Sequence, residues 1–89
     1  MHYVSGVNNA GYLPELSPNV WETFDEAKED LRMMILEDAD YHDEVGETSI
    51  GTALARLAEG VKLWDRCAVI SRNGREYWIK ALNPRNPHA

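Results

Sequence analysis

Sulfur chemistry is nearly absent from this sequence. Cys67 is the single cysteine among 89 residues, so neither an intramolecular disulfide nor a zinc site built from several thiolates can form. Such sparse use of cysteine fits a reducing compartment. We therefore expect a cytoplasmic protein.

Long apolar runs are missing as well. A membrane-spanning helix needs about 20 consecutive apolar residues, and no segment approaches that length. The first residues, MHYVSGVNNAG, also lack the basic start and the apolar run of a secretion signal. The sequence thus predicts a protein with no membrane partner.

Recognisable catalytic signatures are missing too. The chain contains no HExxH motif, no nucleophile elbow, and neither of the glycine-rich loops that bind phosphates or dinucleotides. The carboxylates around His42 do not fit a calcium-binding loop that starts at Asp38, because Asp43 stands where that loop requires glycine. Ser49 also replaces the glutamate of its last position. We expect a non-enzymatic protein with no catalytic residue, metal or cofactor.

The residues that are present favour a folded domain. Apolar residues make up 44% of the chain, charged residues 27%, and there are three tryptophans. This apolar content can offset the conformational entropy lost on folding. We expect one domain over residues 1–82. Residues 83–89, NPRNPHA, are polar and interrupted by proline, and are expected to form a flexible tail.

The net charge of −6 is distributed unevenly along the chain. Eleven of the fifteen carboxylates lie between Glu22 and Glu47, where Lys28 and Arg32 are the basic residues. Seven of the nine lysines and arginines follow from Arg56 onward. An acidic segment is therefore followed by a basic one.

The acidic segment carries the signals of a helix. Thr23 and Glu26 form a capping box, in which the threonine hydroxyl accepts from the Glu26 amide and the glutamate carboxylate reaches back to the cap. Apolar residues then recur at helical spacing. The predicted buried face consists of Phe24, Ala27, Leu31, Met34, Ile35 and Val45, with Tyr41 at its margin.

Asp38 and His42 lie one turn apart on that apolar face, where charged side chains are unexpected. One interpretation is that Asp38 orients the His42 imidazole as a base or fills part of a metal site. We favour a helix that ends near Asp38 or Ala39 and leaves both side chains in a solvated loop, because anions in a last turn oppose the helix dipole. Gly46 is the natural stop if the helix continues.

A second helix is predicted after a cap at Thr48 or Ser49. Gly60 either ends this helix or permits close packing. Its apolar residues at helical spacing are Ile50, Ala53, Leu54, Leu57, Ala58 and Val61.

Two segments predict strands. Asn73 and Gly74 stand between β-prone runs and favour a two-residue type I′ hairpin that pairs Arg72 with Arg75. HYVSGV reads as a strand stopped by Gly6, before a loop whose apolar residues are expected to cover an edge of the core. These residues are Tyr12, Leu13 and Leu16. The expected fold is an α+β domain of order β-α-α-β-β, with a three-stranded antiparallel sheet packed against two helices.

Repulsion within the first helix is the main functional signal. Like charges stand four residues apart, as in Asp40 and Glu44, and each such pair costs about a few tenths of a kcal/mol. Met33 and Leu36 point toward these carboxylates, and an apolar centre with a charged rim suits a protein interface. Selection for solubility remains the alternative. The predicted partner-binding residues are Glu29, Met33, Leu36, Glu37, Asp40 and Glu44.

The hairpin offers a second predicted contact patch. Val69, Trp78 and Lys80 share its second face, which is a contact surface if nothing covers it. Arginines beside Tyr77 and Trp78 would also suit nucleic acid, but the overall acidity opposes this and we expect no direct nucleic-acid partner. A homodimer in which the acidic helix of one copy faces the basic hairpin of another is possible.

Mimicry of DNA is the main alternative to protein docking. Carboxylates would then replace phosphates and block a nucleic-acid-binding protein. Duplex DNA carries one charge per roughly 1.7 Å of its axis, so a mimic needs two rows of acids. The sequence offers one helix and the loop after it, which makes docking the leading hypothesis.

Four segments carry a resemblance to known proteins. YVSG and GYLPE near the start, TFDEAKEDL in the first helix and REYWI near the end resemble small hypothetical proteins encoded by bacteriophages of actinobacteria. That group has no assigned activity. The resemblance implies a phage product that acts in the cytoplasm of an infected bacterium, with a host or phage protein of basic or mixed surface as its target.

Overall fold

The computed structural model describes residues 2–9 and 19–82, so the expected loop with Tyr12, Leu13 and Leu16 and the expected tail over residues 83–89 lie outside the described residues. Four strands and two helices are present in the described part. In chain order they are β1 (His2–Asn9), β2 (Asn19–Trp21), α1 (Phe24–Glu44), α2 (Thr48–Val61), β3 (Val69–Arg72) and β4 (Arg75–Leu82).

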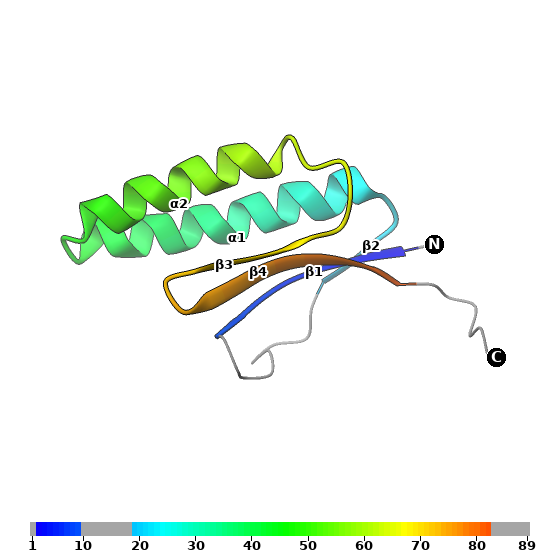
Figure 1. Cartoon of the computed structure of the whole chain (residues 1–89), viewed down its shortest axis with the longest axis horizontal. Coiled ribbons are helices and arrows are strands. Elements are labelled where there is room, and N and C mark those ends of the chain that lie inside the picture. The colour runs from blue at the N-terminus through cyan, green and yellow to red at the C-terminus, as the bar shows by residue number, and fades with distance from the viewer. Residues whose placement is uncertain (1, 10–18, 83–89) are drawn as a thin grey trace.

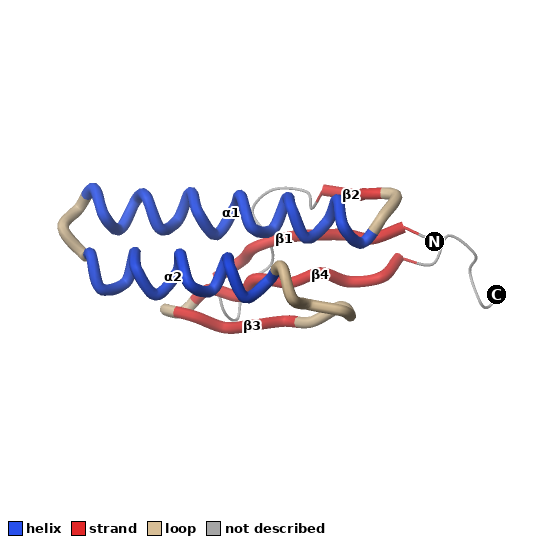
Figure 2. The backbone as a smooth tube through the Cα atoms, turned by 90° about the horizontal axis from the view of Figure 1, so that it is seen from above, coloured by secondary structure: helices blue, strands red, loops and turns tan. Residues whose placement is uncertain are grey.

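The strands form one antiparallel sheet in the order β2-β1-β4-β3. Both helices pack on the same face of this sheet, and they lie side by side along it (Figures 1 and 2). β1 and β4 are the central strands, while β2 and β3 are the edges. The architecture confirms the α+β class.

The sheet has four strands, and the expectation of three was wrong. β2 pairs with the free edge of β1, with Tyr3 opposite Trp21 and Ser5 opposite Asn19. Side chains hold this short strand in place: the Trp21 indole N–H donates to Ser5 Oγ at 3.0 Å, and the Asn19 amide donates to Asp30 at 2.8 Å. Three residues are too few for a period-2 pattern, so β2 carries no periodic signal by which it could be predicted.

Gly6 does not end β1, because it serves a packing purpose inside the strand. It stands opposite Trp78 of β4, and a Cβ at position 6 would collide with the indole ring. Glycine inside a strand commonly marks such a close approach. The sequence alone does not reveal this partner, which is 72 residues away.

The core lies between the helices and the sheet. Three elements contribute the fully or nearly buried apolar side chains, and these confirm the predicted helix stripes at most positions. They are Ala27, Leu31, Ile35 and Ala39 of α1, Leu54, Leu57, Ala58 and Val61 of α2, and Tyr77 and Ile79 of β4. Tyr41 and Val45 are exposed instead, since they lie at the far end of α1.

α1 continues to Glu44, so the expectation that it ends near Asp38 was wrong. The capping box at Thr23 and Glu26 is present. Ala39 is buried in the core, and Asp38 has cationic and phenolic partners on β4, so tertiary contacts outweigh the unfavourable anions of the last turns. The turn after the helix uses Gly46, whose φ of +86° suits glycine.

The two basic residues of the acidic segment support the end of α2. Lys28 Nζ donates to the carbonyls of Lys62 and Trp64, at 3.2 and 3.1 Å, and Arg32 Nε donates to the carbonyl of Ala58 at 3.2 Å. The last carbonyls of a helix lack intrahelical donors and carry partial negative charge. These contacts explain why two cations interrupt the run of acids.

α2 and the hairpin differ from each other in how well local signals predicted them. α2 begins at Thr48, but its N-cap is Glu47, which makes no side-chain capping bond, and Gly60 lies inside the helix. The hairpin is confirmed, with Arg72 opposite Arg75. Asn73 and Gly74 have φ values of 53° and 78°, as the type I′ turn requires.

Candidate functional site

Most of the predicted partner-binding residues lie on one exposed stripe of α1. Successive helical residues are rotated by about 100°, which places this stripe opposite the buried residues Leu31 and Ile35. Met33 lies on the midline of this stripe, one turn after its N-terminal end, and is 52% exposed. At about 1.5 Å per residue, the stripe is roughly 22 Å long. We call it the acidic face, and it consists of Glu29, Met33, Glu37, Asp40 and Glu44.

Leu36 does not belong to the acidic face, and its prediction as an exposed contact residue was wrong. Its side chain is half-buried and packs against the core. Leu36 lies at the margin of the helix that is turned toward α2, about 60° away from Met33 on the wheel. Met33 is therefore the single apolar residue of the acidic face as defined above.

The carboxylates of the acidic face differ in their partners. Arg32 binds both carboxylate oxygens of Glu29, at 2.6 and 2.8 Å. Glu37, Asp40 and Glu44 form no hydrogen bond or ion pair within residues 2–9 and 19–82. The C-terminal half of the face thus presents three uncompensated negative charges to solvent.

Asp38 connects α1 to the sheet and is not in a solvated loop. The Tyr77 hydroxyl donates to Asp38 Oδ2 at 2.6 Å, and Arg75 Nε lies 3.0 Å from the same oxygen without the alignment of a hydrogen bond. Burial of the phenol, together with the hydrogen bond to Asp38 and its charge, raises the pKa of Tyr77, while Arg75 opposes the shift. The phenol therefore stays neutral and donates.

The structure does not assemble Asp38 and His42 into one site. His42 Nδ1 lies 2.8 Å from Glu47 Oε1, across the turn between the helices. Within the described residues, no group of three or more histidine, cysteine or acidic side chains is arranged to hold a metal ion. Asp38 and His42 thus have separate contacts, each of which holds the position of α1.

The predicted patch of Val69, Trp78 and Lys80 is not an exposed aromatic surface. Trp78 is 7% exposed; its indole lies against Gly6 and donates to Asn8 Oδ1 at 2.7 Å. Lys80 Nζ lies 4.8 Å from the ring centroid, a cation–π contact. Val69 remains exposed beside them. With Tyr77 also buried, neither ring of the hairpin is available to stack on a nucleic-acid base.

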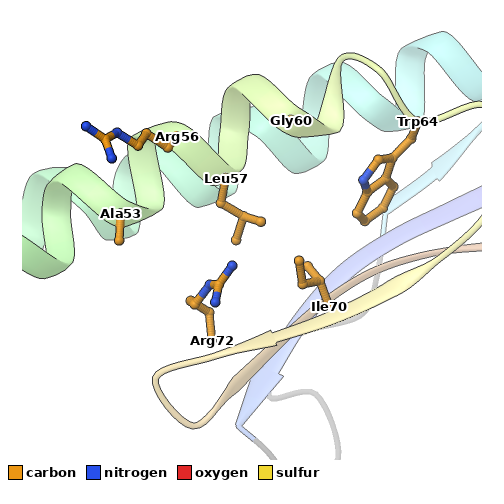
Figure 3. Close-up of a pocket in the computed structure, with 7 residues that line it drawn as sticks. All are labelled: Ala53, Arg56, Leu57, Gly60, Trp64, Ile70 and Arg72. Atoms are coloured by element: carbon orange, nitrogen blue, oxygen red, sulfur yellow. The ribbon is translucent and has the colours of Figure 1, made fainter.

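A hollow of about 450 Å³ lies between α2 and β3, and the sequence did not predict it. In Figure 3, Leu57 and Trp64 point from the α2 side toward Ile70 and Arg72, which point up from β3. We call this site the α2–β3 groove, and it is lined by Ala53, Arg56, Leu57, Gly60, Trp64, Ile70 and Arg72. The sequence signal for this groove is a second apolar stripe that begins on α2 and continues into the turn after it, with Ala53, Leu57, Gly60 and Trp64 at spacings of four, three and four.

Neither helix of the described chain has the length and hydropathy that crossing a membrane requires. Comparison with protein-family models, with curated proteins and with solved structures found no match to this chain.

Proposed function

We propose that this protein is a non-enzymatic interaction protein, which docks the acidic face of α1 onto a partner protein with a basic or mixed surface. The observation that carries the proposal is the set of three carboxylates without partners in the described structure, Glu37, Asp40 and Glu44, beside the exposed Met33. Arg56 and Arg72 are present in the same chain and do not compensate them. Cations on the surface of a partner protein would compensate these carboxylates.

The acidic face is held on a rigid support. α1 is capped at its start, packs against α2 and the sheet, and is linked to β4 by Asp38 and to β2 by Asp30. A helix fixed in this way loses little conformational freedom on binding, which favours association.

The chemistry of the face suggests how a partner would be recognised. Met33 would exclude water at the centre of the contact, while the carboxylates steer a basic surface and fix its orientation. Such binding weakens as salt screens the charges. The resemblance to actinobacteriophage proteins makes a host or phage protein in the bacterial cytoplasm the proposed target.

DNA mimicry has less support as the function. A mimic needs two rows of acids, and the exposed side of α2 within the described chain has the acid Glu59 alongside the cations Arg56 and Lys62. The acidic face by itself spaces its carboxylates at about 4.5 Å or more along the helix, wider than the roughly 3.4 Å per strand of DNA. Docking on a protein surface tolerates that spacing.

Capture from an actinobacterial lysate tests the proposal. The tagged chain is compared with a variant of the acidic face that carries Met33→Ala, Glu37→Gln, Asp40→Asn and Glu44→Gln. We expect a partner that the wild type retains and the variant retains at least about tenfold less, because four rim and centre contacts of about 0.3–1 kcal/mol are lost.

The matched control changes three carboxylates outside the acidic face, Glu22→Gln, Asp25→Asn and Asp65→Asn, all of which are exposed. It should retain the partner as the wild type does. Equal retention of every protein by the wild type and the acidic-face variant, with both folded, would contradict the proposal. DNA that competes for the captured partner would favour mimicry instead.

A further inference from the structure

The arginines of the described chain divide into two groups. Arg32, Arg66 and Arg75 each pair with a carboxylate. Arg56 of α2 and Arg72 of β3 make no hydrogen bond or ion pair in residues 2–9 and 19–82. Both of these arginines are exposed, so their guanidinium groups are accessible to a ligand.

Both of these arginines line the α2–β3 groove. Their positions follow from the fold, because Ile70 and Arg72 are two residues apart on β3 and therefore share the face turned toward α2. Arg56 contributes to the rim on the α2 side, and in Figure 3 its guanidinium group extends along α2, away from Arg72, while Leu57 points into the groove. The groove thus has an apolar floor, with the charge of Arg72 directed toward it and the charge of Arg56 at its outer rim.

The floor of the groove is apolar and open. Leu57, Trp64 and Ile70 supply it, and Trp64 and Ile70 remain half-buried, so they have surface left to cover. Gly60 leaves a gap in the wall, since a Cβ placed there would meet no atom within 4 Å. No other described element lies over this space (Figure 3).

We propose that the α2–β3 groove binds an acidic peptide segment of another protein. One large apolar side chain of the segment contacts Leu57, Trp64 and Ile70, and flanking carboxylates bind the guanidinium groups of Arg56 and Arg72. This site is distinct from the acidic face and is opposite to it in charge.

Charge and shape together select this occupant. A guanidinium group binds a carboxylate through two parallel hydrogen bonds, so two arginines favour an acidic ligand over a neutral one. The hollow has the volume of a small-ligand site, but it is largely open to solvent, which suits a chain that enters and leaves. Alternating apolar and acidic side chains would satisfy both the floor and the arginines.

Fluorescence polarisation of a labelled probe measures the binding. The probe is a nine-residue synthetic peptide with two central leucines flanked by aspartates, and the matched probe has lysines in place of the aspartates. We expect the aspartate probe to bind at least tenfold more tightly than the lysine probe, and binding to fall with salt. Equal affinity for both probes, or no binding of the aspartate probe at millimolar protein, would overturn the proposal.

Gly60→Leu is the most direct variant, because it adds a side chain to the lining of the groove at a position where a Cβ meets no atom within 4 Å. It also replaces a helix-interior glycine, which should keep α2 at least as stable. We expect a loss of probe affinity of tenfold or more with an unchanged or raised melting temperature. Wild-type affinity in this variant would overturn the proposal.

The double variant Arg56→Gln/Arg72→Gln tests the role of the two arginine charges. The control is Lys62→Gln/Arg66→Gln, which removes the same number of positive charges from residues that pair with Glu59 and Asp65. We expect the first pair to lose at least tenfold in affinity and the control to lose less than twofold. An equal loss in both would indicate general attraction and overturn the proposal.

Two further measurements separate other occupants. The first is competition by octanoate, a small carboxylate with an apolar tail. If octanoate displaces the probe at a concentration below the dissociation constant of the probe, the groove is a site for small carboxylates, and the peptide proposal is overturned. The second is analytical ultracentrifugation. If the wild type forms dimers as its concentration rises and Gly60→Leu does not, the occupant of the groove is a second copy of this chain, and the peptide proposal is overturned. A wild-type monomer whose probe is not displaced by octanoate supports the peptide.

Discussion

At the scale of single residues, most of the differences between expectation and structure arise from contacts across the chain. Strand alternation places Trp78 on the second face of the hairpin, which was expected to be a contact surface if nothing covers it. Alternation does not reveal that Gly6 stands opposite and lets the indole lie flat. Leu36 was misplaced for a related reason, since the neighbouring α2 covers one margin of α1.

Gly6 and Trp78 give a prediction at this scale. Gly6→Ala should lower the free energy of unfolding by about 1–3 kcal/mol, because the new methyl group displaces the indole from its contact with Asn8. Denaturant unfolding measures the loss. In a Trp78→Ala background the same change should cost much less, and an undiminished cost there would show that the backbone of β1, not the indole, rejects the side chain.

At the scale of elements, local signals predicted whatever depends on a few neighbouring residues. The capping box at Thr23 and the Asn73-Gly74 turn were predicted and are confirmed, because their hydrogen bonds and dihedral angles are set within four residues. β2 and the last turns of α1 were not predicted, because Ser5, Asp30 and Tyr77 stabilise them from distant elements.

The hydrogen bond between α1 and β4 gives a prediction for the elements. Tyr77→Phe should lower the free energy of unfolding by about 1.5–3 kcal/mol near pH 7, since it removes a donor to the Asp38 carboxylate. Thermal unfolding followed by circular dichroism measures this. An unchanged melting temperature would mean that Arg75 alone holds Asp38.

The pH dependence of the same bond has a definite sign. The pKa of Tyr77 is raised in the folded state, so the unfolded chain loses the phenolic proton first as pH rises. The contribution of Tyr77 is therefore complete below about pH 10 and declines above it. The difference in the free energy of unfolding between the wild type and Tyr77→Phe should therefore decrease between about pH 10 and 12. A difference that does not change with pH over this range would contradict this account.

The start of α1 gives a separate prediction. Thr23→Ala removes the hydroxyl that accepts from the Glu26 amide, and should cost about 1 kcal/mol, which for a domain of this size lowers the melting temperature by roughly 4–8 °C. Thr23→Ser keeps the acceptor and serves as the control. Equal melting temperatures for the alanine and serine variants would argue against the capping contact.

At the scale of the whole molecule, the charge segregation seen along the sequence becomes a segregation in space. The uncompensated carboxylates lie on α1, while the arginines without partners lie at the α2–β3 groove, and α2 stands between α1 and β3 (Figure 2). Arg32, by contrast, donates to a carbonyl of α2, and Lys28 donates to carbonyls of the turn that follows α2. The sequence predicted the acidic side of the molecule. Which charged side chains remain free to bind a partner depends on the ion pairs and hydrogen bonds of the folded chain.

The most direct measurement of the proposed docking is the dissociation constant of the captured partner as a function of salt, for the wild type and for the acidic-face variant. We predict that wild-type affinity falls steeply as salt increases, and that the variant binds more weakly with a flatter dependence, because fewer ionic contacts remain to be screened. The same affinity and the same salt dependence for both proteins would contradict docking through the acidic face of α1.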